Sequence, residues 1–225
     1  MLGRIGERRR SGGSIVTKGS HGESVLRRCA PLGLALGLVV AGCTISPEKR
    51  ADTVNAINRA FQAEYESILK EKGTRVFRGV SRDAAFVGMR AAMLKLGMQI
   101  TDEDPALGYL NVRASAPKPL DLEEWRQAAD ADLPKARKII ADHLNPFVAT
   151  LFTFEPQGLD IVMNVTIIEV REGAEVSLTM RMREIAPPKG DLPRREYPPP
   201  TAVRMGLDKI WRQFDQELRA GTGRR

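Results

Sequence analysis

Cys43 is the residue whose type and position most clearly predict chemistry. It directly follows an uncharged stretch of 13 residues, Ala30 to Gly42, which itself comes after a pair of arginines. The only other cysteine is Cys29, so residues 44–225 contain no thiol and can form no internal disulfide. A lone thiol preceded by two small residues is suited to covalent modification rather than to cross-linking.

The apolar stretch before Cys43 has the length of a signal-peptide core. As a helix its 13 residues would span about 20 Å, at 1.5 Å per residue. The hydrocarbon core of a bilayer is about 30 Å thick, so the stretch is too short for a transmembrane helix. A basic start followed by a short apolar core is typical of an export signal, and we predict that residues 1–42 are removed.

The end of this segment, Val40-Ala41-Gly42-Cys43, resembles the lipobox of bacterial lipoproteins. The resemblance implies a diacylglycerol on the Cys43 thiol, cleavage between Gly42 and Cys43, and a further acyl chain such as palmitate on the new amino group. In that family a residue other than Asp after the cysteine favours the outer membrane, and Thr44 stands there. We therefore expect a lipid-anchored protein on the periplasmic face of the outer membrane. The alternative is an ordinary secretory signal with a cysteine nearby by chance.

Residues 1–24 are polar and are not needed by a signal peptide. The simplest interpretation is a start site assigned too far upstream, with translation beginning near Val25. A twin-arginine export signal is the competing interpretation, but Arg8, Arg9 and Arg10 lie far from the apolar core.

The net charge of +7 does not predict nucleic-acid binding once its location is considered. Residues 1–42 hold seven basic and two acidic residues and so contribute +5. The remaining +2 is spread over a body without a basic aromatic stripe. We expect the membrane and an envelope protein as partners, and no nucleic acid.

Four arginines near the carboxy terminus form the most interesting candidate surface. Arg181 and Arg183 alternate with apolar residues and should project from the polar side of one strand, while Arg194 and Arg195 lie in the Pro-rich loop that follows. If the four cluster, they can hold an anionic lipid, a glycan carboxylate or an acidic partner. The alternative is pairing with neighbouring acids. Those acids are Glu175, Glu184, Asp191 and Glu196.

The body offers no clear catalytic or metal constellation. His143 has no second histidine or cysteine nearby, and its position near the end of a predicted helix suits a structural role. The run Asp102-Glu103-Asp104 lacks the alternating ligands of a calcium loop and is expected to be a solvated turn. We therefore predict no catalytic residue, no metal and no cofactor.

Hydrophobic periodicity predicts helices and strands in a mixed order. Apolar residues at helical spacing predict helices over 51–72, 81–97 and 202–220, and an inserted pair of helices over 121–144 interrupted at Pro134. Strands are expected over 74–80, 98–101, 108–116, 147–154, 159–170 and 174–185.

This order predicts an α+β fold, with an antiparallel sheet of about five to six strands and helices packed on one face, preceded by an amino-terminal helix. The domain boundaries follow: a signal peptide at 1–42, a lipidated tether at 43–50, a helix at 51–72, a globular domain at 73–220 and a tail at 221–225. In element order and anchoring, the body loosely resembles the helix-grip modules found in a lipoprotein of the bacterial barrel-assembly machinery. No motif matches residue by residue, so the resemblance implies no functional residue.

The function expected from these features is a structural or interaction role in the bacterial envelope, without enzymatic activity. One alternative is a carrier of an apolar ligand in a groove between the last helix and the sheet. Its methionines would be Met163, Met180, Met182 and Met205. The other is a carboxylate-based cell-wall hydrolase, which needs two acids converging in a cleft.

Overall fold

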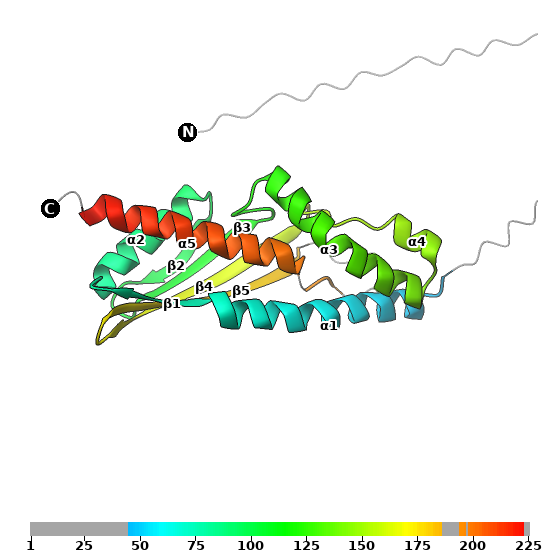
Figure 1. Ribbon diagram of the computed structural model, residues 1–225, viewed down its shortest axis with the longest axis horizontal. Coiled ribbons are helices and arrows are strands. Elements are labelled where there is room, and N and C mark those ends of the chain that lie inside the picture. The colour runs from blue at the N-terminus through cyan, green and yellow to red at the C-terminus, as the bar shows by residue number, and fades with distance from the viewer. Residues whose placement is uncertain (1–44, 186–193, 197, 223–225) are drawn as a thin grey trace, which may run out of the picture. The chain divides into compact units, whose positions relative to one another are not determined.

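The computed structural model describes residues 45–185, 194–196 and 198–222. Contacts divide the chain into two units, Met1–Gly42 and Cys43–Arg225, and every described element belongs to the second. The predicted signal peptide and Cys43 itself lie outside the described residues. The second unit has the predicted α+β architecture, with one antiparallel sheet and helices on one of its faces (Figure 1).

The sheet has five strands in the order β1-β5-β4-β3-β2, and all neighbours are antiparallel. The strands are β1 (Thr74–Arg78), β2 (Gln99–Asp104), β3 (Tyr109–Ser115), β4 (Leu159–Val170) and β5 (Gly173–Glu184). The long hairpin β4–β5 forms the centre. Gly173 begins β5 at a φ of 150°, and a Cβ there would lie 2.1 Å from the Phe77 carbonyl oxygen, so glycine is required.

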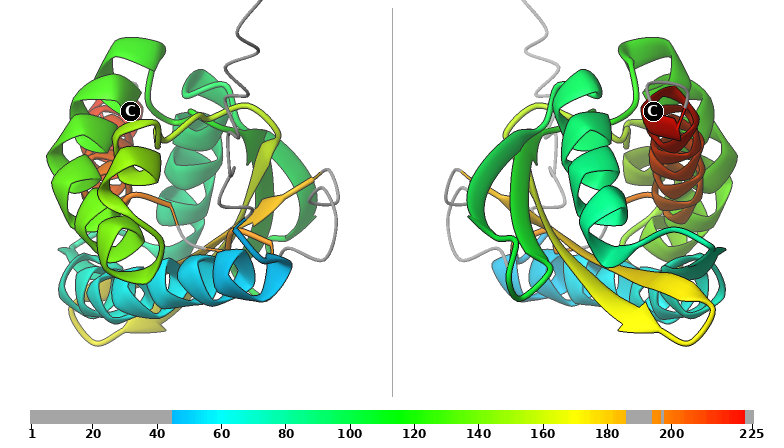
Figure 2. Two further views of the ribbon diagram at one scale, coloured as in Figure 1. Left: turned by 90° about the vertical axis from the view of Figure 1, so that its right-hand side faces the viewer. Right: turned by 90° about the vertical axis from the view of Figure 1, so that its left-hand side faces the viewer.

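Five helices complete the unit: α1 (Pro47–Lys72), α2 (Arg82–Lys95), α3 (Leu122–His143), α4 (Pro146–Thr150) and α5 (Pro200–Thr222). Helices α2, α3 and α5 lie on one side of the sheet, and α1 runs beside the β1 edge (Figure 2). Side chains cap four of the helices: Ser46 for α1, Ser81 for α2, Asp121 for α3 and Asn145 for α4.

Two predictions in the middle of the chain are wrong. The segment expected to be a strand over 147–154 forms α4 and an irregular stretch, because Asn145 caps a helix that Pro146 begins. The helix expected to break at Pro134 continues to His143. Pro134 and Asp130 are both exposed, so water can satisfy the Asp130 carbonyl that loses its helical donor.

Two further local predictions need correction. The acids Asp102, Glu103 and Asp104 lie in β2 rather than in a turn. The turn begins after them, and the Asp104 carboxylate accepts a hydrogen bond from the Leu107 N–H. The last helix, expected over 202–220, begins earlier, at Pro200, and so includes Thr201.

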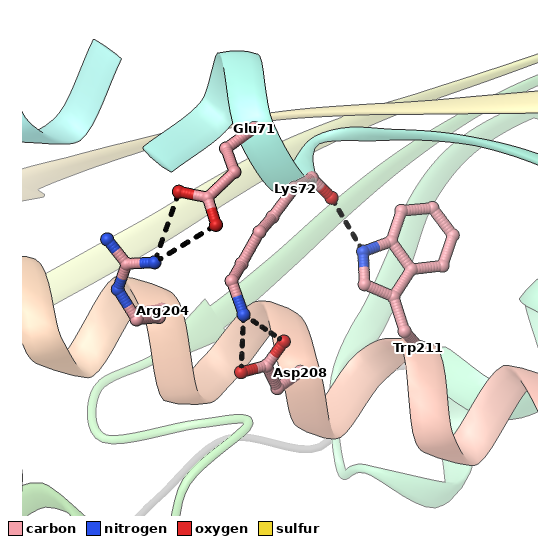
Figure 3. Close-up of polar contacts among 5 residues, drawn as sticks. All are labelled: Glu71, Lys72, Arg204, Asp208 and Trp211. Atoms are coloured by element: carbon pink, nitrogen blue, oxygen red, sulfur yellow. Dashed lines mark hydrogen bonds and ion pairs between the residues drawn. The ribbon is translucent and has the colours of Figure 1, made fainter. Parts of the chain in front are cut away.

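The core lies between the sheet and its helices. Alternate residues of β4 and β5 point into it, and α5 contributes its predicted apolar stripe. In α5, Trp211 and Phe214 are at most 1% exposed and pack against Phe77 of β1, with ring centroids 5.9 and 4.7 Å away. Helix α1 also contacts α5. Figure 3 shows this contact for Glu71 and Lys72, the last two residues of α1.

Candidate functional site

The sheet face opposite the helices carries most of the polar residues of the two central strands. Along β4 and β5, the residues between the buried positions project to this face. They are Asp160, Val162, Asn164, Thr166 and Ile168 on β4, and Glu175, Ser177, Thr179, Arg181 and Arg183 on β5. Apart from Asp160, all of these residues are exposed or half-buried. We call this surface the open face.

A ladder of polar side chains crosses the open face near the middle of the strands. The Asn111 amide of β3 donates to the Asn164 carbonyl oxygen of β4 over 2.8 Å, and the Tyr109 hydroxyl donates to the same oxygen over 3.2 Å. On the other side, the Thr101 hydroxyl of β2 donates to the Asn111 side-chain oxygen. Cross-strand hydrogen bonds of this kind stabilise the strand pairing, and the side chains that form them stay accessible to solvent.

Asp160 is the buried acid of the open face, with only 6% of the residue exposed. Arg113 of β3 donates to its Oδ2 atom from Nη2 at 2.5 Å and from Nε at 3.1 Å. Arg183 of β5 lies directly opposite Asp160 and places Nη2 3.7 Å from the same oxygen. One carboxylate oxygen thus faces two guanidinium groups from the strands on either side.

Arg181 adds a third guanidinium to this group. It lies opposite Val162 on one side of β4, and Arg113 lies opposite the same residue on the other side. With strands about 4.8 Å apart, the two arginine backbones are about 10 Å apart. Arg181 is exposed and makes no ion pair within the part of the chain that the structure describes. Two of the three guanidinium groups lie at the Asp160 carboxylate, so the three arginines and one acid give this part of the face an excess of two positive charges. We call Arg113, Arg181, Arg183 and Asp160 the arginine cluster.

The two arginines of the Pro-rich loop lie elsewhere. Glu184 alternates with Arg183 and so belongs to the helix-covered side of β5, where Arg195 Nε bonds its Oε1 atom at 2.7 Å. The Arg194 carbonyl accepts a hydrogen bond from the Asn58 side chain of α1. The structure therefore brings together Arg181 and Arg183 on the open face and pairs Arg195 with Glu184 on the covered side, while Arg194 Nη1 lies 3.4 Å from the Glu184 carbonyl oxygen at the end of β5.

Arg113 and Asp160 are the members of the cluster that the sequence does not reveal as site residues. The strand of Arg113 alternates Leu110, Val112 and Ala114 with polar residues, so the sequence places Arg113 on a wet face. The sequence does not show that β3 pairs with β4. This pairing brings Arg113 next to Asp160.

Two hollows bear on the other candidate functions. The groove between α5 and the sheet, where an apolar ligand would bind, holds only about 20 Å³ between Met180, Met182 and Val203. A larger cleft of about 250 Å³ lies between α3 and residues 153–157. Trp125 and Phe154 line the cleft. The exposed acids Asp130, on α3, and Glu155, in residues 153–157, line opposite sides of it. Trp125 itself is 3% exposed, and its indole donates to the Phe154 carbonyl over 2.9 Å.

Other chemistry-bearing residues stay apart. His143 is exposed in the last turn of α3. Within residues 45–185, 194–196 and 198–222, no three side chains of the metal-binding types gather into a possible metal site. In the same ranges no helix is both long enough and apolar enough to cross a membrane.

A comparison of the chain with models of known protein families, with curated proteins and with solved structures found no match.

Proposed function

We propose that this chain is a lipoprotein anchored through Cys43 in the bacterial outer membrane, and that its open face binds an acidic envelope partner without performing catalysis. The observation that carries the binding proposal is the arginine cluster, in which Arg113 and Arg183 share the carboxylate of Asp160 and Arg181 lies beside them without an ion pair of the described residues. The motif Val40-Ala41-Gly42-Cys43 supports the anchor.

The arginine cluster has the properties of a prepared anion site. Asp160 holds the Arg113 guanidinium in place through two hydrogen bonds, so this side chain loses little freedom when a ligand arrives. Arg181 projects beside it with its donors available. Guanidinium groups match the geometry of carboxylates and phosphates, which they can bind through two parallel hydrogen bonds. The proposed partner therefore presents clustered carboxylate or phosphate groups.

The alternatives receive less support from the same observations. An apolar carrier needs a pocket of about 300–1,000 Å³, and the groove beside α5 offers about 20 Å³. Met180 and Met182 line this groove and are at most 7% exposed, and Met163 is fully buried in the core. In the cleft of about 250 Å³, Asp130 and Glu155 are exposed carboxylates, whereas a glycosidase acid needs a protected site that keeps its proton.

The test compares two double variants that each remove two positive charges. Arg181→Gln with Arg183→Gln changes the arginine cluster, whereas Arg59→Gln with Arg171→Gln changes exposed arginines on α1 and in the β4–β5 turn. Each lipidated protein is purified from detergent-solubilised envelopes, and the proteins that accompany it are quantified. The proposal expects a partner that accompanies the natural chain and the second variant but is lost from the first.

Rising salt should also release that partner, because exposed charges are screened beyond about 8–10 Å at physiological ionic strength. Equal recovery of the partner with both double variants would contradict the role of the arginine cluster. Recovery of the natural chain from the soluble fraction would contradict the anchor.

A further inference from the structure

Helix α4 presents two large apolar side chains to solvent. Phe147 is 73% exposed, and Leu151, which follows the last residue of α4, is 68% exposed. The two are four positions apart and so lie on the same side of a helical turn. Between them, Ala149 is 4% exposed and points inward. The turn therefore buries a small apolar residue and leaves its two largest apolar side chains outside.

This exposure is held in place by hydrogen bonds at both ends of the turn. The Asn145 side chain accepts from the Val148 N–H over 2.9 Å at the start. At the end, Arg137 of α3 donates from Nη2 to the Thr150 carbonyl over 3.1 Å and to the Phe152 carbonyl over 3.2 Å. A guanidinium from another helix thus satisfies the carbonyls that a helix end leaves open.

Neighbouring aromatic residues are partly or fully buried instead. Phe152 packs edge-on against Phe154 with ring centroids 5.0 Å apart, and Phe154 lies 5.8 Å from Phe61 of α1, which is fully buried. These contacts join the segment after α4 to α1. The fold therefore has an aromatic cluster close by, yet it leaves Phe147 and Leu151 outside it.

The position of α4 in the folded unit indicates which surface Phe147 and Leu151 contact. The amino-terminal end of α1 and helix α4 lie at the same end of the folded unit, on the right of Figure 1 and facing the viewer in the left view of Figure 2. Cys43 is four residues before Pro47, where α1 begins. At no more than about 3.6 Å per residue, the Cys43 backbone stays within about 14 Å of that end. A lipid on Cys43 holds this end against a bilayer.

We propose that Phe147 and Leu151 insert into the boundary between headgroups and acyl chains of the membrane that holds the Cys43 lipid. The inference rests on the proposed anchor. Large apolar side chains exposed on a helical turn with capped ends are suited to this boundary. Near the start of α1, Glu48 and Asp52 balance Lys49 and Arg50, so apolar contact drives the insertion. A lipid tether alone leaves the body free to rotate, whereas this second contact orients it.

The experiment reads the depth of single residues in the lipidated full chain. Residues 44–225 contain no cysteine, and Cys43 is occupied by its lipid, so an introduced cysteine is the one reactive thiol. Phe147→Cys and Leu151→Cys each receive a nitroxide label. Val87→Cys on α2, at a position 66% exposed, is the matched control. The proteins are reconstituted in phosphatidylethanolamine and phosphatidylglycerol vesicles, and collisions with oxygen and with a water-soluble nickel chelate are compared.

Labels at 147 and 151 should collide more with oxygen and less with the chelate than the label at 87, and added salt should not change this. If the protein floats with the vesicles and all three labels report water, the insertion is overturned while the anchor stands. If the protein does not float, the anchor fails and the insertion fails with it.

Discussion

The indole N–H of Trp211 donates a 2.7 Å hydrogen bond to the backbone carbonyl of Lys72, 139 residues earlier in the chain (Figure 3). Lys72 is the last residue of α1, so its carbonyl has no acceptor role inside the helix. The Lys72 ammonium group also donates to both carboxylate oxygens of Asp208, at 2.8 and 2.9 Å, and Arg204 pairs with Glu71 at 3.2 Å. The end of α1 is therefore bound to α5 by one hydrogen bond to its backbone and by two ion pairs between side chains.

Trp211→Ala should lower the free energy of unfolding by about 3–5 kcal/mol, the usual range for a buried aromatic. Trp211→Phe keeps much of the apolar volume but leaves the Lys72 carbonyl without its donor, which costs about 1–3 kcal/mol. Urea unfolding followed by circular dichroism measures both. Asp208→Asn is the control and should cost about 0–1 kcal/mol, because its pair with Lys72 is partly exposed. Unchanged stability of Trp211→Ala would mean that this face of α5 contributes little to the core.

Two arginines of the arginine cluster should behave differently when each is replaced by glutamine. Arg113→Gln removes the main partner of Asp160, which is 6% exposed, and should destabilise the fold by about 1–3 kcal/mol. Arg181→Gln removes no ion pair of the described residues and should leave stability within about 0.5 kcal/mol. Both should weaken binding of an acidic partner. Equal stability losses for the two variants would show that Asp160 does not depend on Arg113.

Asp132 should give the fold an unusual dependence on pH. Burial raises the pKa of this carboxyl above its usual 3.8, although hydrogen bonds from the Thr201 N–H at 2.7 Å and the Thr201 hydroxyl at 2.9 Å act the other way. The folded chain therefore binds this proton more tightly than the unfolded chain. Its contribution to stability is present at low pH and is lost as the pH rises from 3.8 through the raised pKa.

The measurement is urea unfolding at several pH values for the natural chain and Asp132→Asn. The cost of the substitution should shrink as the pH rises. Glu124→Gln is the control of opposite sign: burial acts to raise the pKa of Glu124, but hydrogen bonds from Lys209 and from the Asp121 N–H hold it below its usual 4.5. Its cost should therefore grow as the pH rises toward 4.5. A cost of Asp132→Asn that grows with pH would contradict the assigned direction.

Processing at Cys43 is tested by mass spectrometry of the membrane-extracted protein. The mature chain should begin at Cys43 and carry acyl chains, and Cys43→Ala should leave the precursor uncut or cut elsewhere. A version that begins at Val25 should reach the same membrane, since residues 1–24 are expected to be dispensable. An unmodified amino terminus at another position would rule out the lipoprotein assignment.

Local pattern in the sequence was enough to predict several elements. Hydrophobic periodicity predicts β4 over the residues where it forms and β5 to within one residue at each end, and the apolar stripe of α5 is buried. The helix expected over 81–97 forms as α2, with Ser81 as its cap. These features are predictable because side chains repeat every 2 residues in a strand and every 3.6 in a helix, whatever lies across from them.

Where two local signals competed, the prediction was wrong. Residues 147–154 are rich in aromatic and aliphatic side chains and looked like a strand, but Asn145 and Pro146 start a helix there and Arg137 of α3 holds its end. Pro134 was expected to interrupt α3, and exposure to water lets the helix continue. In the first case a local cap and a residue of α3 decide the outcome, and in the second solvent does.

The order of the amino acids by itself determines which residues alternate along a strand, which residues can cap a helix and where Cys43 lies. The pairing of β3 with β4, which brings Arg113 to Asp160 across 47 positions of the chain, exists only in the folded molecule. Which side of the sheet the helices cover is also decided only by the fold. Glu184 lies on that covered side and pairs with Arg195, whereas Arg181 and Arg183 project to the opposite face. The physical reason is that alternation assigns a residue to one of two faces, whereas the neighbours it meets there depend on strand pairing between distant segments.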